Sequence, residues 1–319
     1  MSILDSDRRD FLRAIIGGAA GVSIGCSAFA QAEPDPIKVT KITGTVFLIS
    51  GDGGNVGLVV SDGGLLMIDG GYAARAGELQ KVIASVASQP VRTLFNTHWH
   101  PDHVGSNEFL GRTGVKIIAH KNTRYWLSRQ VRIEAFHSTF EPLKAEGLPV
   151  EVFTDGGKMN WGQEKVEYKW IPNSHTCTDA YVFLRSANVL HTGDLFFNGV
   201  YPAIDSTTGG WIGGMAAALD KLLKVGDEQT KIIPGHGPLA TKADMKAARD
   251  AMHTIYGRLV LLSKKKASID EVLKANPVSD MEARWGGGFL NGEQFLRIAY
   301  PSIATHAQQM KNAKAGLGW

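Results

Sequence analysis

Four side chains that can bind a divalent metal occur within six positions: His98, His100, Asp102 and His103. They follow directly on the apolar run Val91 to Phe95. In an extended segment, residues two apart face the same side, so His98 and His100 can bind one ion. Asp102 and His103 lie where the chain should turn into a helix, which directs them to a second position nearby. The pattern predicts a two-metal site, and imidazole with carboxylate ligands suits zinc best.

Three later turns also carry a side chain that can bind metal, and each turn follows a predicted strand. These side chains are His175, Asp194 and His236. A single histidine after a strand is more often a polar residue with ordinary partners than a ligand. The three residues in order after the His/Asp cluster indicate that distant turns complete the metal shells.

Alternating and apolar runs predict the elements that position these residues. Short antiparallel strands separated by glycine-rich turns are expected from Lys38 onwards, at 39–50, 55–61 and 65–68. A strand at 91–96, a helix at about 103–110 and a strand at 115–119 form a βαβ unit, which places the first ligands at the carboxyl end of its strand. Helix and loop are expected at 121–148, and further strands at 150–153, 165–171, 180–185, 187–191 and 231–233.

The last part of the chain is predicted to be mainly helical. After a loop at 196–211 and a helix at about 212–225, apolar spacing predicts helices at 245–264, 269–274 and 291–300. No shift in composition marks a linker. We therefore expect residues 33–319 to form one domain with a helical C-terminal extension from about residue 241.

The N-terminus has the pattern of an export signal. Arg8 and Arg9 precede the apolar stretch Ala14 to Ala20, and small residues at 28–32 could be cleaved. This resembles a twin-arginine signal, and the apolar run is too short and glycine-rich to span a membrane. We expect residues 1–32 to be removed and the protein to be periplasmic, with the twin-arginine export machinery as a partner. Lipid attachment at Cys26 is the alternative.

Composition narrows the possible partners. The chain has 319 residues and a formal net charge of +3 at pH 7, which is too small to favour nucleic acid or an anionic membrane surface. Without the signal, Cys177 is the remaining cysteine, so no intrachain disulfide can form and we expect Cys177 to be a small buried residue. A small-molecule substrate is the expected partner.

Taken together, the motif residues resemble the complete motif series of the metallo-β-lactamase superfamily. The resemblance runs from about Lys38 to Leu239 and rests on Asp69, His98, His100, Asp102, His103, His175, Asp194 and His236. It implies an α/β fold, the αβ/βα four-layer sandwich. Two mixed sheets would carry helices on both outer faces, with the metals at one edge.

The resemblance also implies a role for each residue. It assigns the first of two zinc ions to His98, His100 and His175, the second to Asp102, His103 and His236, and a bridging position to Asp194. Asp69 resembles the aspartate that orders the ligand loop from outside the metal shell. Its alternative role is a turn-forming aspartate before Gly70 and Gly71.

The expected chemistry is hydrolysis. Two zinc ions close together lower the pKa of a bridging water from about 15.7 to about 7. One ion would polarise the scissile carbonyl and the other would hold the leaving group, while Asp102 accepts or relays a proton. Asp102 and Asp194 are therefore the candidate catalytic residues, and the substrate bond is an amide, lactam, ester, lactone or thioester.

The substrate class is less well indicated. His175-Thr176-Cys177-Thr178-Asp179 is similar to a turn of zinc β-lactamases whose second site contains cysteine, but Asp194 stands at that cysteine position. Phe197 stands where those enzymes bind the substrate carboxylate with lysine. We place weak β-lactamase activity first, with an antibiotic as substrate. A periplasmic lactonase or esterase, a glyoxalase II-like thioesterase and a non-catalytic zinc-binding protein are the alternatives.

Four aromatic residues near these motifs could line an apolar pocket or belong to the core. They are Trp99, Phe197, Tyr201 and Trp211.

Overall fold

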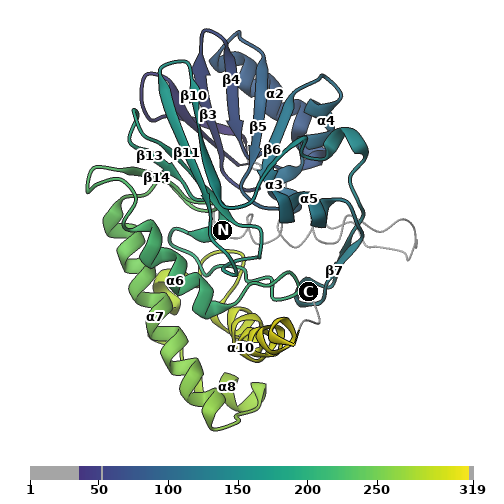
Figure 1. Ribbon diagram of the computed structural model, residues 1–319. Coiled ribbons are helices and arrows are strands. Elements are labelled where there is room, and N and C mark those ends of the chain that lie inside the picture. The colour runs from purple at the N-terminus through teal and green to yellow at the C-terminus, as the bar shows by residue number, and fades with distance from the viewer. Residues whose placement is uncertain (1–35, 52, 316–319) are drawn as a thin grey trace, which may run out of the picture.

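The computed structural model describes residues 36–51 and 53–315 (Figure 1). The expected export signal, its cleavage sites and Cys26 lie outside the described residues. Among the described residues, no helix combines the length and the apolar character that crossing a membrane requires.

Two mixed sheets form the centre of the molecule. In the first, the strand order is β1 (Lys38–Lys41), β2 (Val46–Ser50), β3 (Val56–Ser61), β4 (Gly64–Ile68), β5 (Val91–Asn96), β6 (Lys116–His120), β9 (Glu151–Phe153). In the second it is β10 (Gly156–Trp161), β11 (Glu164–Trp170), β12 (Ala180–Leu184), β13 (Val189–His191), β14 (Lys231–Ile233). Each sheet starts antiparallel and becomes parallel, at β4–β5 and at β13–β14.

The sheets pack face to face because their strands alternate between two apolar layers. In β4, Leu66 and Ile68 face a layer shared with Val182 and Leu184 of the second sheet. Leu65 of the same strand faces the opposite layer, towards α2 (Ala76–Val86). This period of two follows from the pleat of a strand that is buried on both faces.

Helices cover the outer face of each sheet (Figure 1). On the first sheet, α2 buries Leu79 and Ile83. On the second, α6 (Ile212–Leu222) and α7 (Lys242–Lys264) pack with β12 and β14 in one large apolar cluster. Helix, sheet, sheet and helix are the four layers of the predicted αβ/βα sandwich, so the fold-class prediction is confirmed.

The C-terminal helices continue this outer layer. They are α7, α8 (Ile269–Ala275), α9 (Glu282–Trp285) and α10 (Gly292–Lys314). Thr241 caps α7 because its hydroxyl accepts a hydrogen bond from the backbone N–H of Asp244, whose carboxylate in turn accepts one from the backbone N–H of Thr241. Phe295 of α10 is fully buried in the same apolar cluster as α6 and α7.

Some predicted elements were wrong. The strand expected at 39–50 is two strands, β1 and β2, because the N–H groups of Ile42 and Thr43 turn back to the carbonyl of Val46. The single helix expected at about 103–110 is two short helices, α3 (Pro101–Val104) and α4 (Asn107–Gly111). Strand β10 was not predicted, since its exposed edge lacks an apolar run.

The segment 121–148 was also predicted incompletely. It starts with α5 (Lys121–Leu127), as expected, but then forms a hairpin of β7 (Val131–Ile133) and β8 (Ser138–Phe140). Val131 and Ile133 are buried with Trp99 and Leu127. Strands of three residues are too short for an alternating pattern to be detected in the sequence.

Helix α10 is longer than predicted, since it continues through Pro301. Proline removes one backbone hydrogen bond, which normally ends a helix. Pro301 lies on the exposed side, where water can hydrogen-bond the carbonyl that lost its donor. The buried neighbours Ala299 and Ser302 hold the helix on its inner side.

Candidate metal centre

The predicted ligands lie at one edge of the two sheets, in turns that follow strands. His98 and His100 follow β5, and α3 then carries Asp102 and His103. His175 lies between β11 and β12, Asp194 lies in the 3-10 turn Gly193–Leu195 after β13, and His236 follows β14. The carboxyl ends of parallel neighbours share one edge, which brings these distant turns together.

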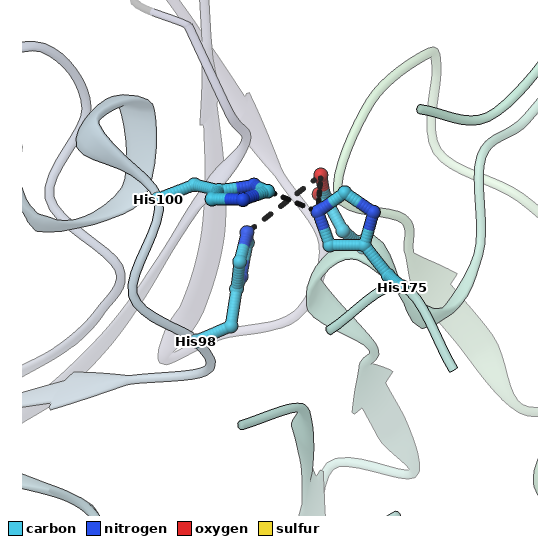
Figure 2. A group of neighbouring side chains, drawn as sticks. His98, His100 and His175 are labelled. Atoms are coloured by element: carbon cyan, nitrogen blue, oxygen red, sulfur yellow. Dashed lines mark hydrogen bonds and ion pairs between the residues drawn. The ribbon is translucent and has the colours of Figure 1, made fainter. Parts of the chain in front are cut away.

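The seven predicted ligand side chains form two groups in which the potential ligand atoms lie within 4.8 Å of one another. One group is His98, His100, His175 and Asp194, and the other is Asp102, His103 and His236. In Figure 2, His98 and His100, from the turn after β5, and His175, from the turn between β11 and β12, point toward one another. The three histidines of the first group and the three residues of the second are those that the sequence analysis assigned to each ion, whereas Asp194 was expected between the groups.

Asp194 lies between the two groups. Its Oδ2 is 3.3 Å from Nε2 of His175 and 3.8 Å from Nε2 of His98 in the first group. Its Oδ1 is 3.1 Å from Nε2 of His103, and its Oδ2 is 3.6 Å from Nε2 of His236. One carboxylate therefore faces both groups.

Hydrogen bonds fix which nitrogen of each imidazole faces inward. Nδ1 of His175 donates to the carbonyl of Ala203 over 2.8 Å, and Nε2 of His100 donates to the carboxylate of Asp205 over 3.3 Å. The lone pairs of the other two nitrogens therefore face each other, with His175 Nε2 and His100 Nδ1 2.8 Å apart. Two lone pairs that converge at this distance repel each other, and a cation bound by both nitrogens would relieve this repulsion.

Asp69 orients two more imidazoles from outside the groups. Its carboxylate accepts hydrogen bonds from the N–H and the hydroxyl of Thr97, over 2.8 and 2.7 Å, and from Nδ1 of His103 over 2.8 Å. The Thr97 oxygen in turn accepts from Nδ1 of His98, over 3.1 Å. Nε2 of both histidines is thereby left with an inward lone pair.

The inner polar atoms lack hydrogen-bond partners, which is costly in a buried site. Within the described part of the chain, Nε2 of His98, Nε2 of His103, Oδ2 of Asp102 and Oδ1 of Asp194 are buried without one. Positive ions at the two groups would satisfy all four atoms. The donor set of imidazole nitrogen and carboxylate oxygen thus fits a pair of divalent metals.

In the first group, burial and charge favour the protonation states that metal binding requires. Burial holds the pKa of His98 well below its usual value and lowers the pKa of His175 to about 4. Burial would raise the pKa of Asp194, but His103, His236 and the other imidazoles outweigh it and hold this pKa well below its usual range. Neutral imidazoles around an ionised carboxylate are the forms that bind metal.

In the second group, burial would lower the pKa of both histidines, but Asp194 and Asp102 raise it, well above the usual value for His103 and to about 9 for His236. A metal must therefore displace protons there.

Comparison with known proteins identifies the family. The sequence model described as "Metallo-beta-lactamase superfamily" matches residues 49–236, which is more than half of the chain. This chain belongs to the metallo-β-lactamase superfamily. The family predicted from the motifs is thereby confirmed, as is the prediction of a hydrolase.

Individual relatives of this superfamily hydrolase are distant. The chain is 24% identical over 149 residues to the metallo-beta-lactamase type 2 of Bacteroides fragilis, over 46% of this chain and 53% of that relative. The match therefore spans about half the length of the curated relative. Helices α7–α10 lie beyond the end of the family match at His236.

Solved structures share the fold of this metallo-β-lactamase superfamily member at low identity. A metallo-beta-lactamase from Pontibacter korlensis has a TM-score of 0.56 and 21% identity, over 68% of this chain and 99% of that one. The sec-alkylsulfatase Pisa1 from Pseudomonas sp. has a TM-score of 0.62 and 18% identity, over 83% of this chain and 50% of that one.

The ligand side chains of this superfamily hydrolase differ in how far solvent reaches them. The side chain of His236 is 14% exposed, and those of Asp102 and His100 are each 7% exposed. The other four ligand side chains are at most 4% exposed. Solvent therefore reaches the centre mainly at His236, Asp102 and His100.

The four aromatic residues noted in the sequence have different surroundings. Phe197 stacks on His236 with ring centroids 5.2 Å apart. Tyr201 is fully buried and stacks on Phe295, so it belongs to the core. Trp99 is buried and donates to the hydroxyl of Thr208, and the half-buried Trp211 stacks on His306.

Cys177 lies in neither ligand group. It is 3% exposed, and its sulfur accepts a hydrogen bond from Nε1 of Trp126. Burial raises the pKa of its thiol to about 12, so the sulfur stays protonated and is a poor ligand.

Two supporting carboxylates were not assigned a role from the sequence. Asp205 accepts from His100 and also from the N–H groups of Thr207 and Thr208. Asp179 accepts from the N–H groups of His175 and Thr176, which fixes the turn that presents His175. An aspartate shortly before two threonines predicts a local turn, but no local pattern reveals the contact with His100 across 105 positions.

Glycines allow the backbone to pack against the ligands. A Cβ atom at Gly235 would lie 1.9 Å from Oδ1 of Asp194, and one at Gly54 would lie 2.2 Å from the ring of His103. Neither position can accept a side chain without moving a ligand. The sequence indicated only turns at both places.

Proposed function

We propose that this superfamily hydrolase binds two zinc ions. The first would be held by His98, His100 and His175, the second by Asp102, His103 and His236, with Asp194 between them. The observation that carries the proposal is the orientation of the imidazoles, because four of the five use the outer nitrogen for a hydrogen bond and direct a lone pair inward. Nitrogen and oxygen donors in this arrangement suit zinc.

Zinc bound at these groups would supply Lewis acidity and a water that ionises near neutral pH. The residues around the metals have separate roles. Asp194 faces both groups and holds them together, while Asp69 and Asp205 keep His103 and His100 in the tautomers that bind metal. Asp102 is one of the more exposed ligand side chains, and its Oδ2 lies 3.2 Å from Nε2 of His236. We assign to Asp102 the transfer of a proton to the leaving group.

The proposed substrate is a cyclic amide or ester, with slow hydrolysis of a β-lactam as the first candidate. Support for a β-lactam comes from the named relatives, two of which are metallo-β-lactamases. Phe197 limits this activity. Its ring stacks on His236 at the position where a lysine would bind the substrate carboxylate, so an anionic substrate lacks that partner.

The stacking of Phe197 on His236 also favours the second candidate, a lactonase or esterase. A neutral lactone or simple ester needs no cation beside the scissile bond, and the apolar ring of Phe197 would suit it. A thioester and a secondary alkyl sulfate complete the set of candidate substrates. The alkyl sulfate is included because the alkylsulfatase structure covers a larger share of this chain than the lactamase structures do.

The test is a substrate panel on the purified, zinc-loaded chain. The panel contains a penicillin, a homoserine lactone, a simple ester, a thioester and a secondary alkyl sulfate, with the Asp194→Asn variant as control. We expect slow β-lactam hydrolysis that the control lacks. Faster turnover of a lactone or ester would replace β-lactam as the substrate. Tight binding of two zinc ions without any turnover would favour a non-catalytic zinc-binding protein.

We also propose that the protein is exported to the periplasm through the twin-arginine machinery, because Arg8 and Arg9 precede an apolar stretch in the sequence. Replacing both arginines by lysine should retain the full chain in the cytoplasm. A variant that is still exported would contradict this route. Cys26→Ser distinguishes a cleaved signal from a lipid anchor, since it should release the protein from membranes only if Cys26 carries a lipid.

A further inference from the structure

His236 differs from the other four imidazoles of the centre. Each of the other four has a hydrogen-bond partner on its outer nitrogen. In the part of the chain that the structure describes, Nδ1 of His236 has none. Its side chain is also the most exposed of the seven, at 14%. No hydrogen bond therefore sets the orientation of this ring.

Aromatic packing orients the ring of His236 instead of a hydrogen bond. Phe197 stacks on His236 with centroids 5.2 Å apart and planes 15° apart. Phe289 meets the same imidazole at 5.6 Å and 64° and meets Phe197 at 6.0 Å. Phe289 is itself only 5% exposed. The imidazole is thus held between two rings, one within the residues that the family model matches and one between α9 and α10.

The segment that carries Phe289 is fixed to the loop that carries Phe197. The carbonyl of Trp285 accepts a hydrogen bond from the N–H of Tyr201 over 2.9 Å. A Cβ atom at Gly288 would lie 2.6 Å from Cβ of Val200, so the two backbones approach as closely as a glycine allows. Phe289 therefore has little freedom to move away from His236.

We propose that Phe289 is a positioning residue for the second metal site. It acts through His236, in place of the hydrogen bond that orients the other imidazoles, and it belongs to the C-terminal extension beyond the family match at residue 236. The proposal rests on the proposed binding of two metals. The C-terminal extension then contributes to the metal centre, because Phe289 holds His236 from outside the residues that the family model matches.

The experiment compares one change at two phenylalanines of the extension, with zinc affinity at each site measured by competition with a chelator. Phe289→Leu removes the ring beside His236, while Phe295→Leu removes the ring that stacks on Tyr201 and touches no ligand. We expect Phe289→Leu to weaken the second site by about tenfold, the lower end of the effect of losing an orienting partner. The first site should keep its affinity. Phe295→Leu should lower the melting temperature and leave both affinities unchanged.

A conservative variant distinguishes the contact of the Phe289 ring with His236 from a general effect on packing. Phe289→Tyr keeps the ring and should restore the affinity of the second site. Equal metal binding by Phe289→Leu and the wild type would overturn the role of Phe289 and leave the two-zinc proposal standing. Parallel weakening of both sites, or the same effect in Phe295→Leu, would show a general loss of structure instead. A wild-type chain that binds fewer than two zinc ions would overturn both proposals.

Discussion

Replacing Asp69 by asparagine should weaken one metal site and spare the other. Asp69 is fully buried and accepts hydrogen bonds from the N–H and hydroxyl of Thr97 and from Nδ1 of His103. Asparagine keeps the size but replaces one accepting oxygen by an NH₂ group. The least costly arrangement places that group at Oδ2, where it faces Nδ1 of His103 and the hydroxyl oxygen of Thr97, and both of these atoms must then accept. The proton of His103 moves to Nε2, which faces Asp194 at 3.1 Å and is the atom needed for metal.

The expected magnitude follows from the role of such orienting partners. Their loss typically costs 10–100-fold in metal affinity, which corresponds to about 1.4–2.7 kcal/mol. Alanine would be a poorer test. It would leave three buried donors unsatisfied at about 1–3 kcal/mol each, which is comparable to the whole stability of a domain.

The assay is zinc binding by chelator competition on Asp69→Asn and on the matched variant Asp205→Asn. Asp205 is the equivalent acceptor for Nε2 of His100, so Asp205→Asn should weaken the first site while Asp69→Asn weakens mainly the second. His98 keeps its own partner, the hydroxyl of Thr97. Wild-type zinc affinity at both sites of Asp69→Asn would refute the tautomer argument. It would also be refuted if Asp69→Asn and Asp205→Asn weakened the same site.

Three further predictions concern packing, reactivity and pH. Gly235→Ala should abolish metal binding, because its Cβ would lie 1.9 Å from Oδ1 of Asp194, whereas Gly257→Ala, with no atom within 4 Å, should bind zinc normally. Iodoacetamide at pH 8 should leave folded Cys177 unlabelled, because burial raises its pKa to about 12; fast labelling would contradict this. In the metal-free protein burial would lower the pKa of His236, but Asp194 and Asp102 raise it from 6.5 to about 9. Protonated His236 therefore stabilises the fold below pH 6.5, and this contribution disappears as the pH rises through 9. The melting temperature of the metal-free protein should fall over this range, and by less in His236→Ala.

The features predicted correctly from the sequence are those with a local pattern. The apolar runs that became β5, β13 and β14 each end directly before a turn, and the fold places those turns at one edge. The spacing of His98 and His100 already indicated a shared direction. The αβ/βα arrangement followed from the family that these residues resemble.

The features that were missed depend on contacts between distant residues. Strands β7 and β8 each have three residues and are stabilised by burial with Trp99, which the sequence pattern does not reveal. Helix α10 passes Pro301 because tertiary packing holds it on both sides of the proline. Asp205 and Phe289 reach the centre through contacts with His100 and His236, and nothing in their own neighbourhood of the sequence indicates this.

The proposal depends most on the number of metal ions that the centre holds. The direct measurement is a zinc titration of the metal-free, full-length chain, followed by the protons released and by the metal content after gel filtration. The seven converging side chains predict an end point of two zinc ions per chain, falling to one in His103→Ala. An end point of one or none in the wild type would contradict the account of this centre.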